Sequence, residues 1–314
     1  INTSELKMLI GNNRIIVIDE AQRVSEIGLT LKRITDNFTN VQLLVTGSSS
    51  FELQSNLNEP LTGRKYEYHL YPISTAELYD SQGLLPVKQM FESRLIYGSY
   101  PDIINHTDEA KELLMNIANS YLYKDLLAMN EIRRPILLEK LLIALALQVS
   151  SEVSYNEVAQ TIGTDNKTVE KYIDLLEKCY VIFRLNAFNR NLRTELKKSK
   201  KIYFYDNGIR NAVIQNFAPL SLRQDTGALW ENFFISERIK ANHYNGNYAK
   251  SFFWRTTQQQ EIDYIEEADG NFTAFEMKWN PNKRPITFPS PFLNNYPVKE
   301  TVVITPENYL EWVM

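Results

Sequence analysis

The chain has 314 residues, of which 44% are hydrophobic and 23% charged, and its formal net charge is −4. This composition is typical of a soluble globular protein, and the length favours two or three domains. No apolar run approaches the roughly 20 residues that span a bilayer, so no membrane segment or membrane partner is predicted. The single cysteine, Cys179, excludes an internal disulfide and predicts a reducing, cytoplasmic setting.

The first part of the chain has the pattern of a parallel sheet. The apolar run at residues 14–18 predicts a strand buried on both faces. A helical stretch, roughly residues 22–37, separates it from a second apolar run at Val41–Val45. Polar residues follow both strands: Asp19-Glu20 after the first and Thr46-Gly47-Ser48-Ser49 after the second. Since ligands bind beyond the carboxyl ends of parallel strands, these residues predict a ligand site.

The middle of the chain is predicted to be helical. Apolar residues recur with a period of 3.6 from about residue 71 to 135, interrupted at Tyr97–Pro101. Pro135 then begins a helix that is too apolar to be exposed and too short to span a membrane.

A helix-turn-helix is predicted next. Ser154 begins a short helix that ends at Gly163, and Thr164-Asp165 begin a second helix that runs through Lys178. Two strands follow, joined by a basic segment: residues 184–201 contain seven basic residues and one acid. These strands and the basic segment would form the wing of a winged helix.

The winged helix has two interpretations. In the first it binds DNA, and its second helix places three residues in the groove: Asn166, Lys167 and Lys171. Four wing residues would then contact phosphates: Arg190, Arg193, Lys197 and Lys198. In the second, the module contacts a protein partner and the basic segment is a solvated surface.

The last part, from about residue 201, predicts a small α/β domain that combines an amphipathic helix with several strands. Asp263 lies on one strand, and Glu276 and Lys278 lie on the next, after an Asp269-Gly270 turn. Residues two apart on a strand share a face, so Glu276 and Lys278 point together and the hairpin brings Asp263 beside them. Two carboxylates can hold Mg²⁺ or Mn²⁺, while the lysine orients or activates water for phosphodiester attack.

This arrangement resembles the PD-(D/E)XK nuclease fold. The resemblance implies that Asp263 and Glu276 bind metal and that Lys278 is catalytic. It also implies that Glu231, on the preceding helix, is a third acidic ligand. The alternative is a domain that keeps the fold with a degenerate, inactive site.

The strand ends near the start of the chain resemble the Walker B and sensor strands of AAA-type ATPases. The resemblance implies that Asp19 holds Mg²⁺, that Glu20 polarises the attacking water and that Ser48 occupies the polar sensor position. Arg64 is either a phosphate-sensing arginine, acting across a subunit boundary in a homo-oligomer, or a surface arginine. The alternative for Asp19-Glu20 is an exposed turn that caps the next helix.

A phosphate-binding loop is absent from these residues. No GxxxxGK[ST] sequence occurs, and the chain begins at Ile1 rather than at a methionine. Since this loop precedes the Walker B strand in such ATPases, we expect it upstream of Ile1. The chain as given is therefore not expected to bind ATP well.

Taken in order, the motifs resemble prokaryotic AAA-type P-loop ATPases with a C-terminal domain of unknown function. The resemblance covers nearly the whole chain, through "IIVIDEAQR", "LLVTGSSS", "YGSYPDII", "KIYFYDNGIRNAV", "LWENFFISERI" and "EIDYI…FEMKW". It implies an α/β multidomain fold with four parts: a partial ATPase core (1–70), a helical lid (71–135), a winged helix (136–200) and a nuclease-like domain (201–314).

These parts predict an ATPase that acts on or with DNA, using ATP and Mg²⁺ in the full-length protein. The alternative is a non-catalytic, nucleotide-switched scaffold in which the winged helix and the tail hold a protein partner. An intact metal site in the tail favours the first function. A neutral winged-helix face, or a Lys278 turned away from Asp263 and Glu276, favours the second.

Overall fold

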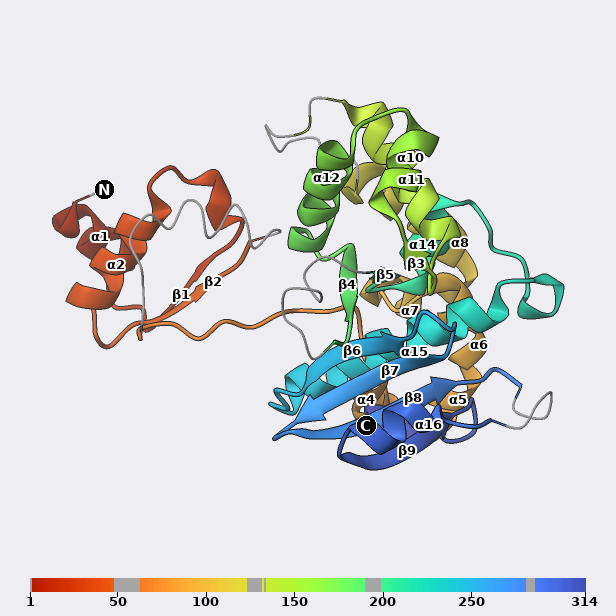
Figure 1. The fold of residues 1–314 in the computed structure, drawn as a ribbon. Coiled ribbons are helices and arrows are strands. Elements are labelled where there is room, and N and C mark those ends of the chain that lie inside the picture. Colours follow the sequence, from red (N-terminus) through yellow and green to blue (C-terminus); the bar gives the residue numbers. More distant parts are fainter. Residues whose placement is uncertain (1, 48–62, 123–131, 133, 190–198, 281–285) are drawn as a thin grey trace. The chain divides into compact units, whose positions relative to one another are not determined.

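The computed structural model of the protein describes residues 2–47, 63–122, 132, 134–189, 199–280 and 286–314 (Figure 1). The protein is a mixed α/β protein with two compact units. The first comprises residues 1–70 and Lys178–Tyr180, and the second comprises the remainder. Among the described residues, no helix combines the length and the apolar character needed to cross a bilayer.

The first unit is a two-stranded parallel sheet with helices. Its elements are α1 (Thr3–Ile10), β1 (Ile15–Ile18), a 3-10 helix η1 (Ala21–Arg23), α2 (Ile27–Asn37) and β2 (Gln42–Val45). In the register of the two strands, Ile15 pairs with Gln42 and Ile18 with Val45. The predicted strand–helix–strand order is therefore confirmed.

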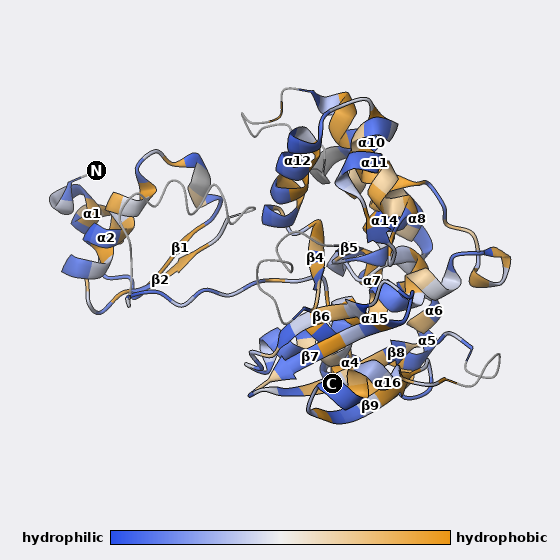
Figure 2. Ribbon diagram, viewed as in Figure 1, coloured by the Kyte–Doolittle hydropathy of each residue, from blue (hydrophilic) through white to orange (hydrophobic). Residues whose placement is uncertain are grey.

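The prediction that these strands are buried on both faces is wrong for the described residues. Alternate side chains are exposed, with Ile15 61% and Val17 62% accessible, although both strands are hydrophobic (Figure 2). The helices supply one apolar layer, in which Leu31 and Ile34 of α2 pack against the inner side chains, such as Ile18. Since successive strand residues point to opposite faces, one layer of helices buries only half of them.

The second unit begins with short helices. They are α4 (Thr75–Gln82), α5 (Leu84–Gln89), α6 (Phe91–Tyr97), α7 (Pro101–Asn105), η2 (Thr107–Glu109), α8 (Ala110–Asn116) and a π-helical turn η3 (Ile117–Leu122). The predicted break at Tyr97–Pro101 separates α6 from α7. The apolar helix predicted from Pro135 is α10 (Pro135–Leu147), and six of its residues are buried.

The second unit also contains a seven-stranded mixed sheet. Its strands are β3 (Glu152–Val153), β4 (Ile182–Ala187), β5 (Lys200–Phe204), β6 (Lys250–Arg255), β7 (Glu261–Ala268), β8 (Asn271–Met277) and β9 (Val298–Ile304). Two helices lie between β3 and β4 in the sequence: α11 (Tyr155–Ile162) and α12 (Asn166–Lys178). The strand order is β3-β5-β4-β6-β7-β8-β9. β4 pairs in parallel with β6 at Asn186 and Ala187. The strands on either side of the helix-turn-helix and those of the C-terminal part therefore share one sheet.

The long helix α15 (Thr226–Tyr244) covers this sheet (Figure 1). Trp230 and Phe234 of α15 belong to one buried cluster with Tyr203, Tyr264 and Phe275 of the strands. The remaining elements are α14 (Asn207–Val213), η4 (Leu220–Leu222), α16 (Ser290–Asn295) and α17 (Leu310–Val313).

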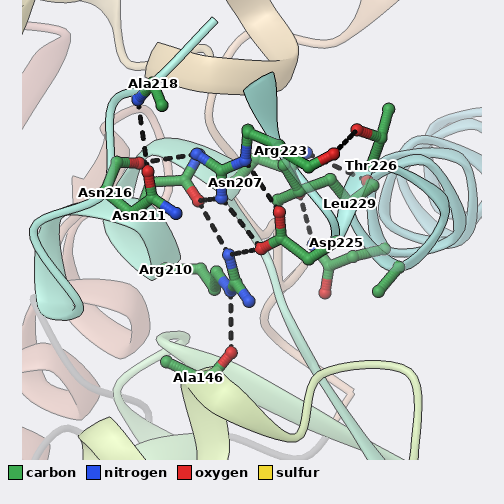
Figure 3. Close-up of polar contacts among 12 residues, drawn as sticks. Ala146, Asn207, Arg210, Asn211, Asn216, Ala218, Arg223, Asp225, Thr226 and Leu229 are labelled. Atoms are coloured by element: carbon green, nitrogen blue, oxygen red, sulfur yellow. Dashed lines mark hydrogen bonds and ion pairs between the residues drawn. The ribbon is translucent and has the colours of Figure 1, made fainter. Parts of the chain in front are cut away.

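The start of α15 is held by a buried polar network (Figure 3). Asp225, which precedes the helix, accepts hydrogen bonds from Arg210 (2.6 Å) and Arg223 (2.8 Å). Arg210 also donates to the backbone carbonyl of Ala146 in α10 (2.7 Å). Burial opposes ionisation of Asp225, but the two arginines lower its pKa to about 2. Since buried charges are stable only when paired, these contacts fix the end of α15 from which the candidate site is built.

Candidate functional site

The hairpin of β7 and β8 brings together the three residues that the sequence singles out. Its turn residues, Asp269 and Gly270, both have positive φ (50° and 78°), as a two-residue hairpin turn requires. The paired strands place Asp263 beside the chain at Glu276, and the backbone N–H of Met277 donates to Asp263 Oδ2 (3.0 Å). Lys278 follows directly after β8.

Lys278 faces both carboxylates. Its Nζ lies 2.7 Å from Glu276 Oε2 and 3.6 Å from Asp263 Oδ2. Burial, together with the charge of Asp263, raises the pKa of Glu276 to about 7. Burial opposes the charge of Lys278, but the two carboxylates raise its pKa above the usual value. At neutral pH, Lys278 is therefore an ammonium ion, suited to stabilising negative charge rather than to accepting a proton.

Glu231 lies close to this group on α15, but it has partners of its own. Its Oε1 accepts hydrogen bonds from Tyr203 Oη (2.7 Å) and from Lys201 Nζ (3.2 Å). Lys201 also forms a close ion pair with Glu261, at 2.5 Å. Burial raises the pKa of Glu231 to about 7; Lys201 opposes this rise and nearby Asp263 adds to it.

Three residues of this cluster were not predicted from the sequence, namely Lys201, Tyr203 and Glu261. Lys201 is only 2% exposed, although its charged side chain would ordinarily reach solvent. A signal was present, because the sequence KKIYF reads as a strand in which a lysine is followed by large apolar residues. A lysine in such a strand needs an acidic partner, but the sequence does not identify which one.

The donor atoms of Asp263 and Glu276 suit a divalent cation. Mg²⁺ prefers carboxylate oxygen and commonly uses one or two carboxylates together with water. In the described part of the chain, no group of three His, Cys, Asp or Glu side chains is arranged to hold a metal ion. An ion here would have only Asp263 and Glu276 as protein ligands, with water completing its coordination, because Glu231 already accepts hydrogen bonds from Lys201 and Tyr203.

The helix-turn-helix presents its predicted contact residues at the surface. Asn166, Lys167 and Lys171 of α12 are all exposed, and so is the acidic Glu170 between them. Asp165 accepts a hydrogen bond from the backbone of Thr168 (2.9 Å) and caps α12, which begins and ends where the sequence predicts. The predicted wing residues lie outside the described residues; they are Arg190, Arg193, Lys197 and Lys198.

A polar groove of about 530 Å³ lies beside this helix pair. It runs between β3, the first turn of α11 and the start of α12. Its charged lining is mainly acidic, since Glu152, Glu157 and Glu170 face Lys200. The described part of the helix-turn-helix is therefore mixed in charge rather than uniformly basic.

In the first unit, Asp19 and Glu20 lie where the carboxyl ends of β1 and β2 meet. Thr46 Oγ1 donates a hydrogen bond to Asp19 and the Glu20 backbone N–H donates to Thr46 Oγ1, so the two strand ends are tied together. Arg64 forms an ion pair with Asp36 of α2. Ser48 lies outside the described residues.

Three domain families match consecutive parts of the chain. Residues 1–79 match a family described as AAA domain. Residues 88–220 and 226–311 match two families described as domains of unknown function, DUF8612 and DUF4143. The order of these matches agrees with the resemblance to AAA-type proteins that carry a C-terminal domain of unknown function.

Curated relatives are described as uncharacterized proteins. One from Haemophilus influenzae is 27% identical over 209 residues, which cover 63% of this chain and 52% of the relative. One from Mycobacterium tuberculosis is 25% identical over 278 residues, covering 86% of this chain and 60% of the relative. One from Methanocaldococcus jannaschii is 23% identical over 280 residues (83% and 60%). The chain thus spans between half and two thirds of these relatives. No solved structure matches it.

The N-terminal part of this chain matches the AAA domain, and the regions that follow match two domain families of unknown function.

Proposed function

We propose that the C-terminal part of this protein is a PD-(D/E)XK-type nuclease domain that hydrolyses phosphodiester bonds with the help of Mg²⁺ or Mn²⁺. One observation carries the proposal: Lys278 lies 2.7 Å from Glu276 and 3.6 Å from Asp263, so a cation-binding carboxylate pair and an ammonium group share one site. Lys278 is 36% exposed, so a phosphate group could approach it from solvent.

Each residue has a role that follows from its surroundings. Asp263 and Glu276 would hold the cation, and the backbone N–H of Met277 fixes the orientation of Asp263. Such an ion polarises a phosphoryl oxygen and lowers the pKa of bound water. Lys278, kept protonated by the two carboxylates, would bind the phosphate and stabilise the additional negative charge of the transition state. Glu231, on α15, would be the third acidic residue of the site, and its side chain pairs with Lys201.

The helix-turn-helix supports contact with DNA as the substrate. The order α10, β3, α11, α12, β4, β5, with β5 paired between β3 and β4, is the order of a winged helix. Lys167 and Lys171 lie exposed on its second helix, beside Asn166. We propose that this helix enters a DNA groove and that the basic segment after β4 contacts the phosphates. The winged helix would comprise residues 136–200 and end on β5, the helical lid residues 71–135 and the nuclease-like domain residues 201–314.

The match to the AAA domain supports nucleotide binding by the full-length protein. Asp19 would hold Mg²⁺ there, Glu20 would orient the attacking water, and Ser48 and Arg64 would contact the phosphates. The link between Asp19 and Thr46 supports this role, because it joins the ends of the two strands at the edge where a nucleotide would bind. ATP turnover would then regulate the DNA-directed activity.

The test is a DNA cleavage assay on this chain with Mg²⁺ or Mn²⁺. We expect wild-type protein to cleave, and Asp263→Ala and Lys278→Ala each to lose at least about 100-fold in rate, in line with the loss of a group that acts in the transition state. Lys299→Ala is the matched control, because Lys299 is an exposed lysine on the neighbouring β9 and should keep full activity.

Two other outcomes would change the assignment. Binding of DNA without cleavage would make the C-terminal part a recognition platform with a degenerate site. If the protein neither binds nor cleaves DNA, this result would favour the nucleotide-switched scaffold that holds a protein partner. The mixed charge of the groove beside α11 and α12 is the observation that keeps this second function open.

A further inference from the structure

A second cluster of buried charges joins α6, α14 and α15, and it is made of residues that the candidate site does not use. Arg94 of α6 and Lys240 of α15 both form ion pairs with Glu237, at 3.4 and 2.8 Å. Asp206, which caps α14, lines a small cavity together with these three residues and is only 5% exposed. Two cations and two carboxylates are thus buried together, and these four side chains carry no net charge.

The carboxylate of Asp206 is held in place by the backbone of two sequence motifs, "YGSYPDII" and "KIYFYDNGIRNAV". Its Oδ2 accepts a hydrogen bond from the backbone N–H of Ser99 (2.7 Å), and its Oδ1 accepts one from that of Ile209 (3.1 Å). Gly98 lies so close that an added Cβ would be 1.9 Å from Asp206 Oδ1. Since each carboxylate oxygen has two lone pairs, Asp206 keeps the capacity to accept a further hydrogen bond.

The ammonium group of Lys240 has more donors than acceptors around it. It carries three N–H donors, but within the described ranges Glu237 Oε1 is the one acceptor that it reaches, at 2.8 Å. Lys240 is 2% exposed, so bulk water does not supply the others. A buried donor without an acceptor costs free energy, because it has lost its hydration and gained nothing in return.

Asp206 and Lys240 attract each other without direct contact. Burial raises the pKa of Asp206, and the charge of Lys240 opposes this rise. Lys240 nevertheless makes its ion pair with Glu237, and none with Asp206, among the residues that the structure describes. Where two complementary polar groups lie near each other but beyond hydrogen-bond distance, a water molecule can bridge them.

The cavity has the size and the lining that such a water molecule needs. Its volume is about 10 Å³, close to the minimum of about 10–15 Å³ that holds a single water molecule, so a larger ligand does not fit. Ser236 also lines the cavity; its hydroxyl donates to the carbonyl of Tyr205 (2.7 Å) and can still accept a hydrogen bond. Because the four charged side chains sum to zero, the lining favours a neutral molecule over an ion.

We infer that this cavity binds one ordered water molecule, which accepts a hydrogen bond from Lys240 Nζ and donates one to Asp206. The water supplies an acceptor to a buried ammonium group and completes the polar link between α14 and α15. Through Asp206 and Ser99, this link reaches the segment after α6, so the water joins part of the predicted helical lid to the helix that carries Glu231.

The first experiment is a crystal structure of this chain at a resolution that shows ordered water. We expect an isolated density peak about 2.7–3.2 Å from both Lys240 Nζ and a carboxylate oxygen of Asp206. The second experiment counts long-lived internal water molecules in solution by ¹⁷O magnetic relaxation dispersion. Lys240→Met removes the donor and should lower the count by one relative to wild type. The matched control is Lys250→Met, an exposed lysine on β6, which should leave the count unchanged.

Three results would overturn this inference. The first is a direct ion pair between Lys240 and Asp206 with no density between them. The second is a peak whose scattering and coordination identify an ion, and the third is an unchanged count in a folded Lys240→Met. Should Lys240→Met not fold, the density in the wild-type crystal decides. None of these measurements depends on DNA cleavage, so this inference and the proposed function stand or fall separately.

Discussion

Replacing Glu231 with glutamine should make this protein more stable at neutral and alkaline pH. Burial raises the pKa of Glu231 from 4.5 to about 7. For an acid whose folded pKa is raised, the contribution to stability is complete below pH 4.5 and is lost as the pH rises through 7. The rise corresponds to about 3 kcal/mol, since each tenfold change in proton affinity is worth about 1.4 kcal/mol. A glutamine at this position remains neutral at every pH, so the substitution avoids this loss.

The assay is unfolding by urea, with EDTA present, followed by tryptophan fluorescence from about pH 4.5 to 8.5. All four tryptophans lie between residues 230 and 312, so the signal reports on the second unit alone. We expect the free energy of unfolding of Glu231→Gln, relative to wild type, to increase by about 3 kcal/mol across this range. The matched control is Glu300→Gln, an exposed glutamate on β9, which should change the free energy of unfolding by less than about 0.5 kcal/mol.

A difference between Glu231→Gln and wild type that stays constant across this pH range would refute this reasoning. It would mean that Glu231 ionises as readily in the folded as in the unfolded protein. A difference of the opposite sign would mean that the ion pair with Lys201 outweighs the cost of burial.

Two further predictions concern buried contacts elsewhere in the second unit. Glu237→Gln should lower the free energy of unfolding by about 3–5 kcal/mol. Unlike Glu231, Glu237 has a pKa lowered to about 2, despite its burial, by the buried cations Lys240 (2.8 Å) and Arg94 (3.4 Å), which would both lose its charge. An unchanged urea midpoint would contradict this. Gly98→Ala should prevent folding or cost at least about 3 kcal/mol, since Gly98 has φ of 77° and an added Cβ would lie 1.9 Å from Asp206 Oδ1. Gly227→Ala, in α15 with open space around it, is the control and should be neutral or stabilising by up to about 1 kcal/mol in the same urea assay.

The elements that could be predicted from the sequence are those whose pattern is local. The helix predicted in the last part of the chain is α15, although it is buried over most of its surface rather than amphipathic. The alternation around the Asp269-Gly270 turn predicted the β7–β8 hairpin. Because residues two apart on a strand share a face, the proximity of Asp263, Glu276 and Lys278 also followed from local spacing.

What could not be predicted depends on which elements become neighbours. Lys201 meets Glu231 and Glu261 through the packing of β5 against α15 and the order of strands in the sheet, and no local pattern encodes either. The prediction that β1 and β2 are buried on both faces was wrong for a related reason. An apolar run shows that a strand is hydrophobic, but the number of layers that cover it is decided by the rest of the fold.

The pairing of β4 with β6 limits how this protein could have been assembled during evolution. Lys201 and Tyr203 belong to the stretch that matches one family, and Glu231 and Glu261 belong to the stretch that matches the next. A recombination breakpoint between them would separate Glu231 from both of its donors and open a sheet edge at β6. A chimaera built at that boundary would inherit a buried, unpaired carboxylate. The two stretches are thus expected to fold as one unit, although they match two different families.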